Sequence, residues 1–99
     1  MNKLNLNITD QAKADIKIIT KYIAKDNKSA ARSFSLYLYK ICEKLSNYPE
    51  LGTVRPDFTY KNYRFFTVKK HYVIAYRIEG DNLFISRILA TYQDICSLF

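Results

Sequence analysis

The chain has 99 residues, of which 48% are hydrophobic and 25% charged, and it contains only two glycines and two prolines. This length fits one domain, residues 1–99, and the composition excludes a disordered chain or a flexible linker. The formal net charge is +7, and basic residues are spread over both halves of the chain. Such a positive field attracts nucleic acid or an acidic protein segment, although a basic surface can also serve solubility alone.

Neither a signal peptide nor a membrane span is expected, because the chain has no apolar run of the required length. Cys42 and Cys96 lie far apart in the sequence, and the single histidine, His71, cannot complete a zinc site with them. There is also no Gly-rich phosphate loop and no recognisable nucleophile–histidine pattern. We therefore expect a cytoplasmic protein with reduced thiols, no metal and no cofactor.

The N-terminal segment, residues 3–8, alternates polar and apolar residues, which predicts a half-buried strand. Thr9 and Asp10 then offer side-chain oxygens that can cap a helix. From Ala12 the apolar spacing becomes four, three, four, which predicts a helix with one buried stripe. The residues of the stripe are Ala12, Ile16, Ile19 and Ile23. Every fourth residue between them is a lysine, at positions 13, 17, 21 and 25, which predicts a solvated ridge or a contact with an acidic partner.

A second helix follows the polar turn Asp26-Asn27-Lys28, with Ser29 as its expected cap. The same apolar spacing recurs there at Phe34, Leu38, Ile41 and Leu45. Tyr48-Pro49-Glu50-Leu51-Gly52 ends this helix and turns the chain. Because the connection is short, the two helices should form an antiparallel hairpin.

The remainder predicts three strands, at residues 63–68, 72–78 and 83–89, joined by short turns. Short links imply antiparallel pairing, and Glu79-Gly80-Asp81-Asn82 is a hairpin signal. Residues 91–99 are too few for an assignment beyond a final helical turn. The expected fold is therefore α+β, with the order β-αα-βββ and the helical hairpin packed on one face of an antiparallel sheet.

Each of the three strands carries one arginine, namely Arg64, Arg77 and Arg87. Arg55 lies in the preceding loop, and Lys69, Lys70 and His71 form the turn between the first two strands. With the interleaved tyrosines and phenylalanines, these arginines could form one basic, aromatic sheet face that grips phosphates or carboxylates and stacks on bases. The alternative is that each arginine lies at a strand edge or pairs with Glu79, Asp81 or Asp94.

Four local patterns, taken in order, resemble the RelE/ParE superfamily of toxins, and ParE more closely than RelE. They are Ala12-x-x-Asp15-Ile16-x-x-Ile19-x-x-Tyr22-Ile23, Leu45-x-x-Tyr48-Pro49-x-Leu51-Gly52, Tyr72-x-Ile74-x-Tyr76-Arg77, and Ile85-x-Arg87-Ile88-Leu89 followed by Asp94. The resemblance covers nearly the whole chain. It implies the toxin of a type II toxin–antitoxin pair, often plasmid-stabilising. Its antitoxin would neutralise it by wrapping an acidic, partly disordered segment around it.

The resemblance implies two alternative targets, since ParE-like toxins poison DNA gyrase and RelE-like toxins cut mRNA on the ribosome. Where the family often carries His-x-Arg-Arg, this chain has Ala90-Thr91-Tyr92-Gln93. Cutting RNA needs proton-transfer groups and cations around the scissile phosphate, so this departure favours a gyrase inhibitor without catalysis of its own. The candidate target-binding residues are Arg55, Arg64, Lys69, Lys70, Arg77, Arg87 and Tyr92. The candidates for a ribonuclease are Tyr92, Arg64, Lys69, Lys70, His71 and Arg87. A module that only binds nucleic acid or the antitoxin is the third alternative.

Overall fold

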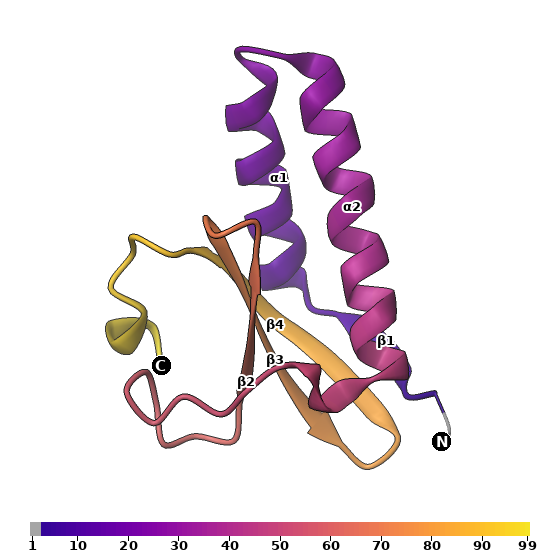
Figure 1. The fold of residues 1–99 in the computed structure, drawn as a ribbon, viewed down its shortest axis with the longest axis vertical. Helices are drawn as coiled ribbons and strands as arrows, with labels where there is room; N and C mark the ends of the chain where they lie inside the picture. The colour runs from indigo at the N-terminus through magenta and orange to yellow at the C-terminus, as the bar shows by residue number, and fades with distance from the viewer. Residues whose placement is uncertain (1–2) are drawn as a thin grey trace.

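The computed structural model describes residues 3–99 (Figure 1). In chain order the elements are β1 (Asn5–Ile8), α1 (Asp10–Ala24), α2 (Lys28–Asn47), the short 3₁₀ helix η1 (Pro49–Leu51), β2 (Arg64–Val68), β3 (Tyr72–Glu79), β4 (Asn82–Ala90) and the 3₁₀ helix η2 (Ile95–Leu98). The predicted order β-αα-βββ is confirmed. Neither long helix, nor any other helix within residues 3–99, is long and apolar enough to cross a membrane.

The four strands form one sheet in the order β1-β4-β3-β2. As predicted, β2, β3 and β4 pair antiparallel. β1 joins β4 in parallel, so the complete sheet is mixed. The parallel pairing is short and ends at Ile8, which lies opposite Ile85, while β4 continues to Ala90. The second half of β4 therefore has a free edge.

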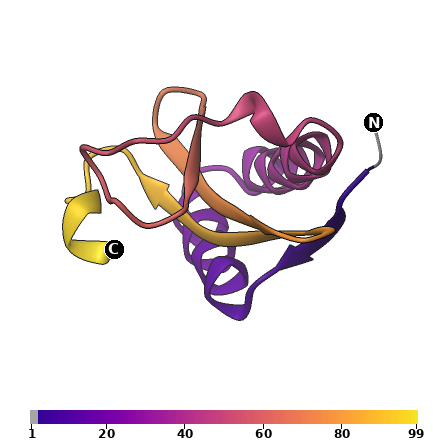
Figure 2. The same ribbon diagram turned by 90° about the horizontal axis from the view of Figure 1, so that it is seen from below.

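The helical hairpin packs on one face of this sheet and buries the predicted apolar stripes. Figure 2 shows the two helices nearly end-on, with the strands crossing the base of the hairpin. The strand residues of this core include Ile74, Tyr76 and Leu83. Its helical residues are Ala12, Ile16, Phe34, Leu38, Cys42 and Leu45, with Ile19, Ile23 and Ile41 packed against them. Each fully buried aliphatic side chain contributes about 1.5–3 kcal/mol, which exceeds the repulsion along the lysine ridge.

The opposite face of the sheet is covered as well, which the sequence analysis did not predict. Phe65, Val73, Ala75 and Leu89 form a second core there, and Ile95 of η2 closes it. Phe58, Tyr63 and Phe99 pack against this core, with the ring centroids of Tyr63 and Phe99 4.8 Å apart. The loop before β2 and the C-terminal tail thus share one small aromatic cluster, and Figure 1 shows them side by side.

The helix caps agree with the prediction at α1 and differ at α2. Thr9 caps α1, since its Oγ1 accepts a hydrogen bond from the backbone N–H of Ala12 at 3.2 Å. The predicted cap Ser29 is wrong, because α2 already begins at Lys28 and Ser29 lies inside its first turn. Asn27 has the extended backbone of a capping residue, and its Oδ1 accepts from the N–H of Ala30 at 3.0 Å.

Candidate functional site

The free edge of β4 is where helix α1 meets the sheet through a buried carboxylate. Asp15 is 7% exposed, and its Oδ2 accepts a hydrogen bond from the backbone N–H of Ile88 at 2.9 Å. The two carboxylate oxygens also accept from the Arg87 guanidinium, at 2.8 and 3.2 Å. Asp15 therefore satisfies a backbone donor that β1 leaves unpaired, and it fixes Arg87 by a bidentate ion pair.

A bulge in β4 accounts for the direction of Arg87. Ile85 pairs with Tyr76 and Arg87 pairs with Ala75, so Ser86 is an additional residue on β4. Thr9, at the end of β1, donates its hydroxyl hydrogen to the carbonyls of Ile85 and Ser86, at 2.9 and 3.2 Å. Bulges bend a strand and re-aim its side chains. This bulge lies where β1 ends, immediately before the residue that reaches Asp15.

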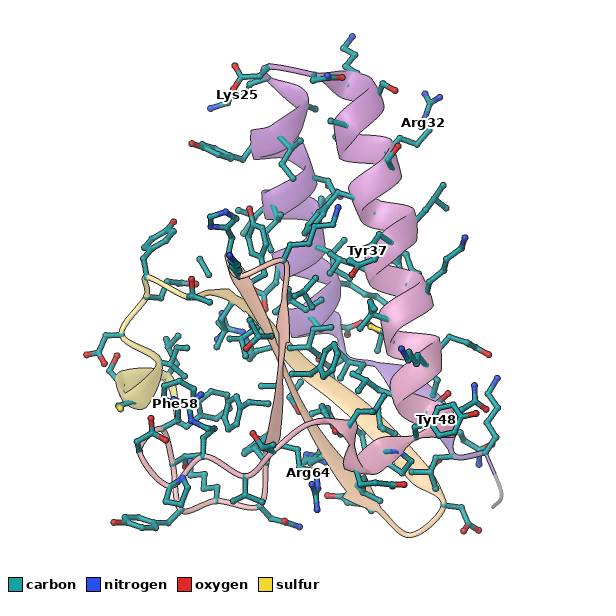
Figure 3. All side chains as sticks on the ribbon, viewed as in Figure 1. Lys25, Arg32, Tyr37, Tyr48, Phe58 and Arg64 are labelled. Atoms are coloured by element: carbon teal, nitrogen blue, oxygen red, sulfur yellow. The ribbon has the colours of Figure 1, made fainter. Side chains whose placement is uncertain are left out.

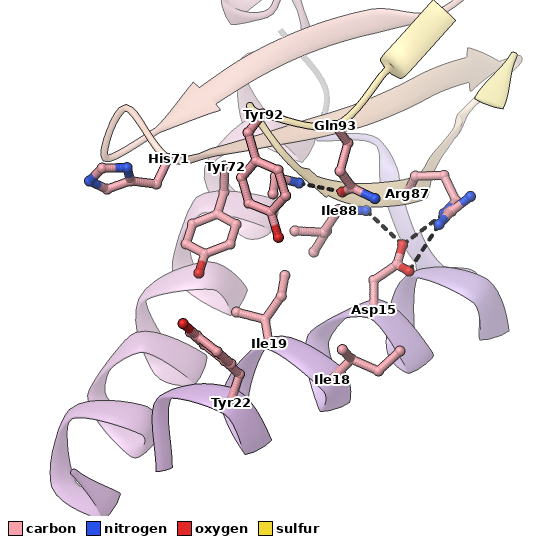
Figure 4. Close-up of a pocket in the computed structure, with 11 residues that line it drawn as sticks. Asp15, Ile18, Ile19, Tyr22, His71, Tyr72, Arg87, Ile88, Tyr92 and Gln93 are labelled. Atoms are coloured by element: carbon pink, nitrogen blue, oxygen red, sulfur yellow. Dashed lines mark hydrogen bonds and ion pairs between the residues drawn. The ribbon is translucent and has the colours of Figure 1, made fainter. Parts of the chain in front are cut away.

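Next to this ion pair lies a cleft of about 450 Å³ between α1, the end of β4 and the start of the C-terminal tail (Figure 4). Three tyrosines line it, Tyr22 from α1, Tyr72 from β3 and Tyr92 from the tail. His71 and Arg87 line it too, so the structure brings together three of the predicted site residues: His71, Arg87 and Tyr92.

Hydrogen bonds to the turn between β2 and β3 and to the end of β4 hold the start of the C-terminal tail at the cleft. The backbone N–H of Thr91 donates to the carbonyl of His71 at 2.9 Å, and its hydroxyl donates to the carbonyl of Lys70 at 3.1 Å. The side-chain oxygen of Gln93 accepts from the N–H of Ala90 at 2.8 Å. These bonds fix the position of Tyr92, whose own side chain is 90% exposed.

Tyr72 is the most enclosed of the three tyrosines, with its ring 5.1 Å from that of Phe34. Burial raises its pKa above the usual value for a phenol, and the neighbouring Tyr92 and Tyr22 add to this effect. The Tyr72 hydroxyl is therefore protonated at neutral pH and can donate a hydrogen bond. A protonated hydroxyl at this position can donate a hydrogen bond to a bound group but cannot accept a proton as a base.

The predicted arginine face is wrong, because the three arginines do not lie on one side of the sheet. Arg64 is opposite Tyr76 and so shares the face of the helices, whereas Arg77 follows Tyr76 on β3 and lies on the other face. Arg77 donates to Glu79 at 2.8 Å and stacks 4.5 Å over Phe84. Side-chain alternation thus places Arg64 and Arg77 on opposite faces of the sheet, and each of the three arginines, Arg87 included, is bonded to an acceptor within the chain.

Arg64 belongs to a buried turn between α2 and β2, which we call the Gly52 turn and define by Pro49, Gly52, Arg64 and Tyr76. The Tyr76 hydroxyl donates to the Pro49 carbonyl at 2.5 Å and accepts from the Gly52 N–H at 2.8 Å. Arg64 donates to the Gly52 carbonyl at 2.7 Å. Both backbone groups of Gly52 are therefore bound by side chains of the sheet, and Arg64, which is labelled in Figure 3, has a structural partner.

Among the remaining candidates, Arg55 is engaged within its own loop and the two lysines are accessible. Arg55 donates to Asp57 at 2.9 and 2.6 Å, which lowers the pKa of that carboxyl group. Lys69 and Lys70 are exposed, and both have left-handed backbone conformations, with φ of 50° and 66°. Non-glycine residues seldom adopt these angles, and such strain is often found at functional sites. The Lys69 ammonium lies 4.7 Å from the centre of the Tyr37 ring.

Asp15, Tyr22 and Tyr72 are site residues that the sequence analysis named only as part of family patterns. Asp15 follows Ala12 by three residues and precedes Ile19 by four, so an acidic residue borders the buried stripe. That position signals a buried partner, but helical spacing does not identify Arg87 as that partner. No group of three or more His, Cys, Asp or Glu side chains within residues 3–99 could hold a metal ion.

Fold and cleft together define a small basic α+β protein with a helical hairpin on one face of a twisted sheet and an aromatic cleft between α1 and the end of β4. A sequence model described as "ParE toxin of type II toxin-antitoxin system, parDE" matches residues 6–95. The chain therefore belongs to the ParE toxin family. The predicted resemblance is confirmed.

Solved structures show the same fold. A chain of the chromosomal ParDE TA system from P. aeruginosa superposes with a TM-score of 0.75 at 21% identity, over 89% of this chain and 96% of that one. A conserved hypothetical protein from Helicobacter pylori superposes with a TM-score of 0.53 at 18% identity, over 91% and 97% of the two chains. No curated protein matches the sequence.

Proposed function

We propose that this protein inhibits DNA gyrase by binding to it, without catalysis of its own, and that a cognate antitoxin neutralises it. The observation that carries the proposal is the match of residues 6–95 to the ParE toxin family. The cleft supports it, because Asp15 already neutralises the arginine there, Arg87. A bound arginine contributes little to stabilising the additional charge of a phosphoryl transition state.

Lys69, Lys70 and Tyr92 are the predicted target-binding residues that we assign to direct contact. Both lysines are exposed, and Tyr92 extends from the tail that is bonded to their turn. Arg64 and Arg87 would act by positioning the Gly52 turn and the end of β4. Arg55 and Arg77 pair at the surface, where ion pairs contribute only about 0.2–1 kcal/mol, so a target could displace their partners at little cost.

The test is a supercoiling assay with purified gyrase, relaxed plasmid, ATP and this protein. Loss of supercoiling with trapped cleaved plasmid, reversed by the antitoxin, is the expected result. Lys69→Gln/Lys70→Gln should weaken inhibition at least about tenfold, because close charge pairs at interfaces contribute more than 1 kcal/mol each. Lys44→Gln/Lys61→Gln removes the same charge from other exposed positions and should leave inhibition unchanged.

Ribosome-dependent mRNA cleavage is the second candidate, and one observation favours it: His71 and Tyr92 line the same cleft. Normal supercoiling in the presence of a protein that still arrests growth would shift the proposal to this activity. Transcripts would then be broken at ribosome positions, and Tyr92→Phe should stop the breaks if the hydroxyl supplies a proton. A chain that does neither but binds the antitoxin would be a binding module. Gyrase and ribosomes both place the proposed action in the cytoplasm.

A further inference from the structure

The cleft between α1, the end of β4 and the C-terminal tail has aromatic surface that the fold does not bury. We call it the tyrosine cleft and define it by Tyr22, Tyr72 and Tyr92, whose rings surround one hollow in Figure 4. Tyr22 is 71% exposed and Tyr92 is 90% exposed, and Ile18, which lines the same cleft, is 68% exposed. Single exposed apolar residues are ordinary, but a group of them around a hollow of about 450 Å³ marks a binding surface.

The charges around the tyrosine cleft are either positive or neutralised. Asp15 is the only acidic residue among the described residues that line the cleft, and its carboxylate is already paired with Arg87. The turn that carries Lys69 and Lys70 is hydrogen-bonded to the start of the tail, and both lysines are exposed. Their left-handed backbone conformations are unfavourable for lysine, so the chain keeps two cations beside the rings at a cost in conformational energy.

The cleft also contains hydrogen-bond donors whose directions are fixed. The side-chain oxygen of Gln93 accepts from the Ala90 N–H at 2.8 Å, and because a backbone N–H can only donate, this contact sets the orientation of the amide. The NH₂ group of Gln93 then remains as a donor at the cleft. The protonated hydroxyl of Tyr72 is a second donor. Nucleobases present carbonyl oxygens and ring nitrogens at their edges, and these atoms accept hydrogen bonds.

We propose that the tyrosine cleft binds one unpaired base of a single-stranded nucleic acid, while the turn at Lys69 and Lys70 contacts the flanking phosphates. Every base has a π face that stacks on aromatic side chains, and sites for single strands combine such side chains with cations along the backbone. This inference goes beyond the proposed function, because inhibition by contact with the gyrase protein needs no site for a base. It rests on that function only to the extent that the strand is DNA held by gyrase.

Two other ligands fit the same surface less well. A duplex would satisfy the lysines, but its paired bases stay stacked on one another and cannot enter the cleft. An acidic peptide would also pair with the lysines, but its carboxylates would meet the electron-rich ring faces of Tyr22 and Tyr92. An unpaired base with its phosphates gains from the rings and from the cations together.

The experiment is a fluorescence anisotropy titration of labelled oligonucleotides with this protein alone, at two salt concentrations. The probes are a short oligothymidylate, an oligouridylate of the same length and a DNA duplex. Tyr22→Leu/Tyr92→Leu keeps apolar side chains but removes two stacking faces, so it should bind oligothymidylate about tenfold more weakly. Lys69→Gln/Lys70→Gln should weaken binding and reduce its salt dependence, because fewer counterions are released. The chain has no tryptophan, so stacking is also measured directly as quenching of tyrosine emission.

Two matched variants control for lost tyrosines and lost charges elsewhere. Tyr39→Leu/Tyr60→Leu removes two exposed tyrosines outside the cleft and should stay within about twofold of the wild-type affinity. Lys44→Gln/Lys61→Gln removes two exposed cations and should stay within about threefold. Circular dichroism melting checks that each variant is folded. Tyr92→Leu alone, at the more exposed position, carries the test if the double cleft variant is unstable.

Tighter binding to single strands than to the duplex, lost in the cleft variant and kept in the tyrosine control, is the expected result. A preference for oligothymidylate would assign the site to DNA, and a preference for oligouridylate would assign it to RNA. Equal losses in the two tyrosine variants, equal affinity for duplex and single strand, or no measurable binding by the wild-type protein would overturn the proposal. A wild-type protein that inhibits gyrase but binds no oligonucleotide refutes this inference alone. One that binds single strands but leaves gyrase active refutes the proposed function alone.

Discussion

Replacing Tyr76 by phenylalanine tests how the chain connects its helical hairpin to its sheet. The Tyr76 side chain is fully buried, and its hydroxyl is bonded to both Pro49 and Gly52. The substitution keeps the ring and removes only the oxygen. It leaves the Gly52 N–H and the Pro49 carbonyl without this partner, in a region where water has little access.

The expected cost follows from these two bonds. Each intramolecular hydrogen bond contributes about 0.5–1.5 kcal/mol, and a buried donor left unpaired costs about 1–3 kcal/mol. We therefore expect Tyr76→Phe to lower the free energy of unfolding by about 2–3 kcal/mol. For a domain of this size, that corresponds to a decrease in Tm of roughly 10–20 °C.

Urea unfolding followed by circular dichroism measures this change, with Tyr60→Phe as the matched control. Tyr60 is 94% exposed, so its variant should stay within about 0.5 kcal/mol of the wild type. If Tyr76→Phe costs no more than the control, the Gly52 turn does not hold the hairpin to the sheet. The family pattern at residues 45–52 would then need another explanation.

Three further predictions concern the same core and the cleft. Gly52→Ala should lower the free energy of unfolding in urea by about 1–3 kcal/mol through overpacking, since a Cβ there would lie 2.6 Å from Tyr76 Cε1. Gly80→Ala should lower it by only about 1 kcal/mol, because that position has open space and only its φ of +59° is strained for alanine. Asp15→Ala should lower the free energy of unfolding in urea by about 2 kcal/mol, which is less than for a fully buried pair because the Arg87 side chain is a quarter exposed. Adding Arg87→Met should recover part of this loss, because no unpaired charge then remains. A double variant as unstable as the sum of the two single variants would show that the pair does not couple. Finally, burial raises the pKa of Cys42 from 9.0 to about 12. Because the unfolded thiol ionises first, stability should fall as pH rises from about 9 towards 12, and Cys42→Ala should flatten that slope in unfolding curves measured from pH 8 to 11.

The helices and strands could be predicted from the sequence because their signals are local. The spacing of Ile16 and Ile19 predicts a buried helical face, and the alternation from Tyr72 to Ile78 predicts a strand. Ser29 shows where this approach fails. Asn27 and Ser29 are two residues apart and both types can cap a helix, but only Asn27 has the extended backbone of a capping residue.

The site was predicted less completely, since its partners are distant in sequence. Arg87 contacts Asp15 at the point where β1 has ended and β4 carries a bulge, and no periodic pattern in the sequence indicates either feature. The C-terminal tail had no pattern that indicated a second core, although Ile95 closes it. His71 and Tyr92 were predicted as candidates, but the sequence did not indicate the hydrogen bonds of Thr91 that bring them to one cleft.

The strand order has a consequence for the synthesis of this chain. β4 is the last strand to leave the ribosome, yet it lies between β1 and β3. Asn5 pairs with Asn82, so at a synthesis rate of about 5–20 residues per second β1 remains without its partner strand for roughly 4–15 s. Products that terminate before β4 lack the centre of the sheet, the bonding partner of Asp15 and the wall of the tyrosine cleft. A cell that makes chains without β4 is therefore not exposed to the finished surface, and a newly made chain acquires that surface only after β4 has been translated.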